Sequence, residues 1–169
     1  MKRKINVWEY APIILEELGK GALVTAKADG KVNPMTIGWG TLGIEWGRPI
    51  FTVFVRESRF TKGMLEKNPE FTVNVPYGAA AKEILGYCGS KSGRDVDKVK
   101  ELGLTLEEPV SISVPGIREL PLTLECKVIY KQEQDPAAID PACRARNYPQ
   151  DRDYHTAYYG EILAAYVIE

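Results

Sequence analysis

The chain is organised around the stretch Asn33-Pro34-Met35-Thr36-Ile37-Gly38-Trp39-Gly40, which ends a predicted strand. Gly38 and Gly40 lack side chains, so a flat ligand can approach the main chain closely there. Trp39 can cover one face of such a ligand or fill the core beneath it. Since the run also carries backbone N–H donors, it predicts a binding site for a flat ring.

The composition is that of an ordinary globular domain. Of the 169 residues, 44% are hydrophobic and 27% are charged, and the net charge is −1. This length predicts a single domain, residues 1–169, with a sizeable core. The balanced charge favours neither nucleic acid nor an anionic membrane as a partner. No apolar run reaches the roughly 18 residues that a membrane span needs.

The three cysteines, Cys88, Cys126 and Cys143, are widely separated and include no CxxC pair. We therefore expect neither a disulfide framework nor a zinc site, and we expect a reducing, cytoplasmic compartment. The basic start of the chain is followed by glutamates instead of an apolar run, so it does not have the pattern of a signal peptide.

Short strands outnumber helices along the chain. Strands are predicted at residues 22–28, 32–37, 49–55, 70–75, 110–114, 120–130 and 155–168, the last bent at Gly160. Helices are predicted at residues 7–18, 58–67, 79–85 and 94–102, with Ser58 as an N-cap and Gly19 as a C-cap residue. Turns are predicted at residues 29–30, 43–47 and 115–116, and a loop that can include a helical turn at residues 135–148. Many short strands with few helices favour a mainly β fold that closes into an antiparallel barrel.

The run Gly38-Trp39-Gly40-Thr41-Leu42-Gly43 matches the GxGxxG pattern of dinucleotide-binding folds. The pattern has that meaning only where a helix opens at its third glycine. Here residues 44–49 predict a turn into a strand, and no alternation of strands and helices follows. We therefore do not expect a Rossmann fold.

Two later segments have the composition of anion sites. Arg56 and Arg59 lie at a predicted helix start, where unpaired N–H groups attract phosphate. The hydroxyls of Ser58 and Thr61 can complete such a site. A capped surface helix with solvated charges explains the same residues equally well. The second segment, residues 88–98, places two glycines and two serines before a polar helix, and taken alone it is better explained as a solvated loop.

His155 is the only histidine of the chain, and it begins the last predicted strand. Its titration near neutral pH suits acid–base chemistry. However, a lone histidine at a strand start is more often structural, and no carboxylate spacing marks a catalytic pair. Cys88 is expected to be a small buried residue and not a nucleophile, because no base is paired with it in the sequence.

Taken together, these stretches resemble the flavin reductase-like family, which includes the flavoredoxins. The resemblance covers nearly the whole chain after Gly21, and it rests on the order and spacing of short motifs. The motifs are residues 33–39, Arg56-Glu57-Ser58-Arg59-Phe60-Thr61, residues 88–98, residues 124–128, His155-Thr156 and Gly160-Glu161-Ile162.

The resemblance implies a split β-barrel homodimer that binds FMN non-covalently near the interface between subunits. The implied cofactor-binding residues are Asn33, Met35, Thr36, Ile37, Gly38 and Trp39 along the ring, Arg56, Ser58, Arg59 and Thr61 around the phosphate, and Ser92, Gly93 and Lys98 in the segment that closes over the cofactor. His155 matches a position near the flavin, so it is the implied catalytic residue, with a role in binding the nicotinamide. Glu57 is a departure, since a carboxylate inside the phosphate segment must point away.

The implied activity is the reduction of flavin, or of an acceptor, by electrons from NADH or NADPH. No catalytic acid is needed for hydride delivery to a flavin, and none is marked in the sequence. The alternative is a flavoredoxin-like FMN carrier that is reduced by another protein and has no NAD(P)H activity of its own. A third hypothesis is a split-barrel protein that binds another flat ligand, such as haem, or only another chain. For the flavin hypotheses the expected partners are flavin and nicotinamide nucleotides, a second copy of the chain and a redox protein.

Overall fold

Eight strands form one antiparallel sheet, in the order β3-β2-β6-β9-β10-β5-β4, with β1 beside β10. The structure is a computed structural model, and it describes residues 1–169. The strands of this sheet are β1 (Lys2–Lys4), β2 (Ala22–Ala28), β3 (Lys31–Ile37), β4 (Gly40–Glu45), β5 (Arg48–Arg56), β6 (Glu70–Val75), β9 (Leu122–Glu133) and β10 (His155–Ile168). A separate pair joins β7 (Leu106–Glu107) to β8 (Gly116–Ile117).

The sheet curls into a split barrel. Its edge strands β3 and β4 are consecutive in the chain and are joined only by Gly38 and Trp39, so the two edges of the sheet meet at that point. The edges are not hydrogen-bonded to each other, which leaves the barrel open along this seam. The predicted mainly β fold is confirmed. The GxGxxG run opens no helix, because strand β4 begins at Gly40.

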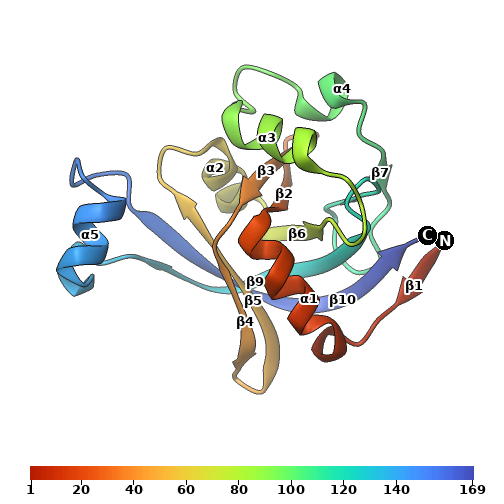
Figure 1. The fold of residues 1–169 in the computed structure, drawn as a ribbon, viewed down its shortest axis with the longest axis horizontal. Helices are drawn as coiled ribbons and strands as arrows, with labels where there is room; N and C mark the ends of the chain where they lie inside the picture. The colour runs from red at the N-terminus through yellow and green to blue at the C-terminus, as the bar shows by residue number, and fades with distance from the viewer.

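Five α-helices lie outside the sheet. They are α1 (Val7–Lys20), α2 (Phe60–Lys67), α3 (Lys82–Ser90), α4 (Lys98–Leu102) and α5 (Pro141–Asn147). Figure 1 shows α3 and α4 together at one end of the molecule, α5 projecting at another, and the two termini side by side. No helix combines the length and the hydropathy needed to cross a membrane.

The core lies inside the barrel, with a smaller cluster beneath α3. Phe51, Phe71 and Tyr158 are among the largest fully buried side chains of the barrel interior. The smaller cluster includes Leu23 from the outer face of β2 and Cys88 from α3. As predicted, Cys88 is buried, and this burial raises the pKa of its thiol to about 11.

Two backbone features that the sequence predicts are confirmed. The hairpin between β2 and β3 turns at Asp29 and Gly30, whose φ angles of 51° and 75° suit an Asp-Gly turn. Strand β10 changes register between Tyr159 and Gly160. An added Cβ at Gly160 would lie 2.5 Å from the Phe71 ring, so the irregular strand needs a glycine there.

Two predicted helix ends are wrong, because a glycine alone is a weak helix breaker. Helix α1 contains Gly19 and ends at Lys20, with Gly21 as its C-cap residue at a φ of 129°. Helix α3 contains Gly86, although the sequence predicts that the helix stops there. A glycine inside a helix costs only about 1 kcal/mol relative to alanine, and tertiary packing offsets that amount.

Three predicted helix starts are also wrong, and the first is that of α3, which begins at Lys82 instead of Ala79. Arg59, not Ser58, is the N-cap residue of α2, because the Ser58 side chain is bound by Asp153. Helix α4 starts after Asp97, whose carboxylate caps it by accepting a hydrogen bond from the Lys100 N–H. A side-chain oxygen therefore caps the start of α4, whereas α2 begins without a side-chain cap.

The strand predicted at residues 110–114 is absent. The Val110 and Ser111 N–H groups donate hydrogen bonds of 2.7 and 2.6 Å to the carboxylate of Glu125, which is fully buried. These backbone donors are therefore satisfied by a side chain instead of a neighbouring strand, and the segment forms a loop.

Three further elements differ from the predictions. Strand β4 is not predicted, and it runs from Gly40 to Glu45 into the turn predicted at residues 43–47. The loop predicted at residues 135–148 contains α5, which Asp140 caps through the N–H groups of the first turn. Strand β1 is not predicted, because three residues are too few to show a period.

Candidate functional site

Two adjoining cavities lie beside the seam of the barrel. The first, of about 200 Å³, is lined by Met35, Thr36, Ile37, Gly38, Trp39, Phe54, Arg56, Arg59 and His155. The second, of about 110 Å³, is lined by Asn33, Met35, Ser58, Arg59, Phe60, Thr61, Lys91, Ser92, Gly93, Arg94 and Lys98. Both cavities are lined by Met35 and Arg59, so they adjoin. Together they are called the cleft, and every site residue predicted from the sequence lines it.

The first cavity is called the ring end of the cleft, because its walls suit a flat ligand. An added Cβ at Gly38 would meet no atom within 4 Å, so the main chain is open there. The Trp39 side chain is 46% exposed, and its ring centroid lies 5.0 Å from that of His155. Open backbone beside aromatic and aliphatic walls is the usual composition of a site for a planar ring.

Gly40 has a different role from the one predicted. An added Cβ would lie 2.9 Å from the Phe51 ring and 3.2 Å from Leu18. Glycine is therefore needed at this position to make room for core side chains and not to admit a ligand.

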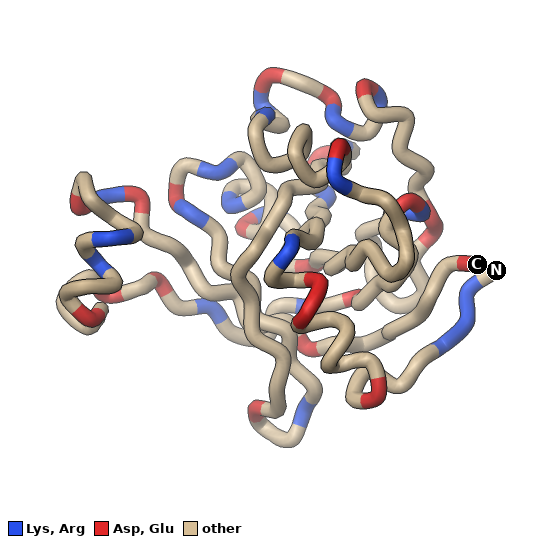
Figure 2. The backbone as a smooth tube through the Cα atoms, in the orientation of Figure 1, with Lys and Arg blue, Asp and Glu red and all other residues tan.

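The second cavity is called the phosphate end, because it faces the N-terminus of α2. Arg59 is the N-cap residue of this eight-residue helix, and its guanidinium makes no hydrogen bond or ion pair within the chain. The first N–H groups of the helix add a partial positive charge at the same place. Figure 2 shows Lys and Arg both on the loop before α2 and on the loop before α4, which together flank this end of the cleft.

Arg56 lines the ring end but is already bound within the chain. Its guanidinium donates to the backbone carbonyls of Asp153, at 3.1 Å, and Asn147, at 3.2 Å. It also lies 5.1 Å from the centroid of the Tyr148 ring. Arg56 therefore ties the segment after α5 to the cleft, whereas Arg59 is the arginine left free for an anion.

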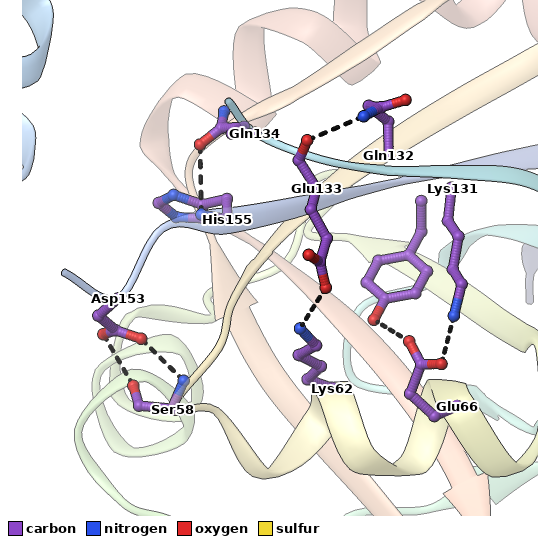
Figure 3. Close-up of polar contacts among 10 residues, drawn as sticks. Ser58, Lys62, Glu66, Lys131, Gln132, Glu133, Gln134, Asp153 and His155 are labelled. Atoms are coloured by element: carbon purple, nitrogen blue, oxygen red, sulfur yellow. Dashed lines mark hydrogen bonds and ion pairs between the residues drawn. The ribbon is translucent and has the colours of Figure 1, made fainter. Parts of the chain in front are cut away.

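Ser58 is turned toward Asp153, as Figure 3 shows. The Ser58 N–H and hydroxyl both donate 2.8 Å hydrogen bonds to the Asp153 carboxylate. Burial opposes ionisation of Asp153, but these hydrogen bonds and the charge of Arg56 outweigh it and lower the pKa of the carboxyl group. The Ser58 hydroxyl thus positions the loop before α2 in this structure.

Lys98 is buried in the wall of the phosphate end, with 3% of its surface exposed. Its ammonium group donates 2.9 Å hydrogen bonds to the carbonyls of Pro34 and Cys88. Burial lowers its pKa, and the nearby charge of Arg59 acts in the same direction. The lysine therefore joins three elements, α4, β3 and α3, directly behind the cleft.

The remaining predicted residues of the phosphate end are tightly packed. The Asn33 amide donates a 3.1 Å hydrogen bond to the Thr61 hydroxyl, and both residues are buried. An added Cβ at Gly93 would lie 2.2 Å from Asn33 Oδ1 and 2.7 Å from the Phe60 ring. The Ser92 hydroxyl accepts a hydrogen bond from the Arg94 N–H. These residues shape the cavity wall, and only glycine fits at position 93.

His155 is buried beside the ring end, with 7% of its surface exposed. Burial, reinforced by the positive charge of Arg56, lowers the pKa of its imidazole to about 4. Its Nδ1 lies 2.5 Å from the Tyr148 hydroxyl. At neutral pH the imidazole is therefore uncharged, and its orientation is fixed by its hydrogen bond with Tyr148, the residue that follows α5.

Sequence reasoning missed three residues of the site. Phe54 adds an aromatic wall to the ring end, and its place as an outward-facing residue of a predicted strand was the available signal. Tyr148 and Gln134 contact His155, but no local pattern marks them, because they lie in loop and strand-end positions far from the motifs.

Glu57 lies outside the two cavities, so its carboxylate does not enter the phosphate end. It is exposed and lines an outer hollow with Arg152 and Pro149. The departure noted in the sequence is therefore compatible with an anion site. No group of three or more His, Cys, Asp and Glu side chains is placed to hold a metal ion.

Comparison with known proteins gives concordant matches. The family model described as the flavin reductase like domain matches residues 20–169. Among solved structures, the flavoredoxin from Methanosarcina acetivorans is 30% identical, with a TM-score of 0.69 covering 88% of this chain and 68% of that one. The flavoredoxin of Desulfovibrio vulgaris (Miyazaki F) is 25% identical, with a TM-score of 0.70 covering 88% of this chain and 69% of that one.

A curated relative is also similar over much of the chain. An uncharacterised protein of Archaeoglobus fulgidus is 29% identical over 133 residues, which are 79% of this chain and 64% of that protein. The matched region is therefore less than two thirds of the length of this relative.

Proposed function

Because the chain belongs to the flavin reductase-like family, we propose that it binds FMN in the cleft and uses it to pass electrons from NADH or NADPH to a flavin or another acceptor. The observation that carries this proposal is that the two cavities of the cleft adjoin at Met35 and Arg59. An open, aromatic ring end therefore lies beside a phosphate end that contains a free arginine and a helix N-terminus.

The residues present fit the two parts of the cofactor. A phosphate monoester needs cations and N–H donors, and Arg59 offers a guanidinium that has no partner in the chain beside the N-terminus of α2. A planar ring needs apolar faces and close approach to the backbone, which Trp39, Phe54 and Gly38 offer. Lys91 and Arg94 add positive charge at the phosphate end.

When bound, the flavin supplies the hydride and single-electron chemistry. The chain binds and orients the two reactants. Arg59 and the α2 N-terminus hold the phosphate, while Trp39 and Phe54 restrict the position of the ring and exclude water from its faces. His155, the proposed catalytic residue, contributes an uncharged imidazole at the ring end, where it can hydrogen-bond the nicotinamide.

A carrier function is the second candidate. The observation that favours it is the similarity to two flavoredoxins, of which one is 30% identical. In that case the same cleft would hold FMN, and electrons would come from another protein instead of a nicotinamide nucleotide.

One experiment tests the proposal and separates the two candidates. The purified protein is loaded with FMN, its absorption spectrum is recorded, and NADH or NADPH is added without oxygen. Bleaching of the flavin by either nucleotide is the result expected of a reductase, and it identifies the donor. A flavin spectrum that neither nucleotide changes supports the carrier. A protein that shows no flavin absorbance after unbound FMN has been removed contradicts both.

We also propose that the protein is a homodimer in the cytoplasm. Exposed apolar side chains support the dimer: Ile44 is 71% exposed, Trp46 60%, Leu163 42% and Tyr130 40%. The ring centroids of Trp46 and Tyr130 lie 5.8 Å apart, so these two side chains form one exposed apolar surface. Three free cysteines, one of them exposed, support a reducing compartment.

Sedimentation equilibrium tests the dimer. The wild type is expected at twice the chain mass and Trp46→Arg at the monomer mass, because a charge at the centre of an apolar interface is costly to bury. Trp8→Arg is the matched control, since Trp8 is 44% exposed on α1. A monomeric wild type contradicts the proposal.

A further inference from the structure

Three groups close a ring of hydrogen bonds that begins and ends at His155. The Nδ1 atom of its imidazole lies 2.5 Å from the Tyr148 hydroxyl oxygen. That hydroxyl lies 2.7 Å from Oε1 of Gln134. The same Oε1 accepts a 3.2 Å hydrogen bond from the backbone N–H of His155, a contact that Figure 3 also shows.

Counting protons around this ring determines where the imidazole proton sits. Gln134 turns its oxygen, which can only accept, toward the Tyr148 hydroxyl. If Tyr148 donated its single proton to His155 instead, two oxygens would face each other at 2.7 Å with no hydrogen between them. The arrangement is satisfied only when Tyr148 donates to Gln134. The short contact to the imidazole must then be donated by Nδ1–H.

The second imidazole nitrogen, Nε2, is left for the cleft. Nε2 makes no hydrogen bond within the chain, and no buried side-chain nitrogen or oxygen lacks a partner, so Nε2 is accessible. His155 lines the ring end, whereas Tyr148 lies outside it. The charged groups around the imidazole are Arg56 from β5, Asp153 from the preceding loop and Arg59 at the start of α2.

We propose that Tyr148 and Gln134 are positioning residues that hold His155 as the tautomer with its proton on Nδ1, so that Nε2 presents a hydrogen-bond acceptor to the ring end of the cleft. A ligand that meets this nitrogen must then offer an N–H or O–H donor. For a nicotinamide, an assignment that rests on the proposed function, the donor is the carboxamide NH2. A ligand ring that carries only hydrogen-bond acceptors at this place cannot hydrogen-bond to Nε2.

The tautomer can be measured directly, because His155 is the only histidine. Long-range proton–nitrogen spectra of the nitrogen-15-labelled, untagged and cofactor-free protein contain one imidazole and need no assignment. At pH 7 we expect a protonated Nδ1 and an unprotonated Nε2. A wild-type spectrum with the proton on Nε2, or a charged imidazole, overturns the proposal.

Two variants test the ring of hydrogen bonds. In Tyr148→Phe, Nδ1 loses its acceptor, and in Gln134→Leu the Tyr148 hydroxyl is free to donate to Nδ1. Both changes are expected to convert the Nδ1–H tautomer from the dominant to the minor form. Tyr154→Phe is the matched control, since the Tyr154 hydroxyl contacts Asp151 and Arg144 and not His155. An unchanged tautomer in both folded variants contradicts the roles of Tyr148 and Gln134.

Ligand choice is tested with two probes on the FMN-loaded protein. Nicotinamide carries the NH2 donor, and 3-acetylpyridine replaces it with a methyl group. Nicotinamide is expected to shift the Nε2 resonance, and 3-acetylpyridine is not. Equal shifts, or none, overturn the ligand assignment. Failure of the proposed function would show separately as a protein without a flavin spectrum, which leaves the tautomer measurement valid.

Discussion

The two arginines of the motif before α2 have the same chemistry but different partners. The Arg56 guanidinium donates two hydrogen bonds to backbone carbonyls, while the Arg59 guanidinium donates none. The Arg56 guanidinium can turn toward an anion only by breaking these two hydrogen bonds, which costs free energy. The free energy of phosphate binding is therefore expected to depend chiefly on Arg59.

Arg59→Gln is expected to weaken FMN binding by about 1.5–3 kcal/mol, because it removes a charge-assisted hydrogen bond. This corresponds to roughly a tenfold to hundredfold higher Kd, measured by quenching of flavin fluorescence. The free energy of unfolding in urea should stay the same, since the side chain has no partner in the chain. The matched change Arg56→Gln is expected to leave FMN affinity nearly unchanged and to lower the free energy of unfolding, because it removes the hydrogen bonds to the segment after α5. Equal FMN affinity of Arg59→Gln and wild type contradicts the assignment.

At Gly93 the space for a side chain is missing. In Gly93→Ala the new Cβ would overlap Asn33 and Phe60, so we expect a loss of about 1–3 kcal/mol of stability and a distorted phosphate end. In the control Gly63→Ala, an exposed position inside α2, no atom lies within 4 Å of the added Cβ. That change is expected to stabilise the protein by up to about 1 kcal/mol. Urea unfolding measures the stability of both variants, and a Gly93→Ala protein as stable as the wild type contradicts this prediction.

At the scale of elements, the cleft depends on how α3 and α4 are held against β3. These helices cover the outer face of the barrel and supply the loop of the phosphate end. Lys98 joins them through one buried ammonium group. These hydrogen bonds restrict the relative position of α3, α4 and β3 more than apolar contacts would, because hydrogen bonds have preferred directions.

Lys98→Met is expected to lower the free energy of unfolding by about 1–3 kcal/mol, because the Pro34 and Cys88 carbonyls lose their donor while they stay buried. Lys100→Met is the control on the same helix, where the lysine is exposed. Thermal or urea unfolding distinguishes the two variants. Equal stability of both would show that the ammonium group does not hold these elements together.

At the scale of the whole molecule, His155 couples stability to pH. The folded-state pKa of about 4 lies below the unfolded value of 6.5, so the unfolded chain binds a proton first as the pH falls. The contribution of His155 to stability is therefore fully present above pH 6.5 and is lost as the pH falls toward 4. The full difference of about 2.5 pKa units is worth on the order of 3 kcal/mol.

Urea unfolding at pH 7 and pH 5.5 should show a loss of about 1 kcal/mol from this residue alone. In His155→Asn the loss should be smaller by that amount, while the carboxylates, including Asp153, contribute equally to both proteins. If the two proteins lose stability in parallel over this range, His155 is not held uncharged by the fold.

Local sequence patterns predicted most of the long strands, whereas the residues of the cleft were implied by the resemblance to a known family. Asp29-Gly30 marked a hairpin because few residues adopt positive φ readily, and that preference is local. Alternating apolar residues marked the strands because successive side chains of a strand point to opposite faces, which is also a local property. The patterns failed at Gly19 and Gly86, where the preference of one residue was outweighed by packing of the whole helix.

What the sequence by itself determined is the mainly β fold, through local backbone preferences, and the set of residues around the cleft, through the order of motifs that it shares with a known family. Only the tertiary structure decided which of them are free to act. Arg56 is bound and Arg59 is not, Lys98 is buried, and His155 is held by Tyr148 and Gln134. These outcomes depend on hydrogen-bond partners up to 97 positions away in the chain, so no local pattern can contain them.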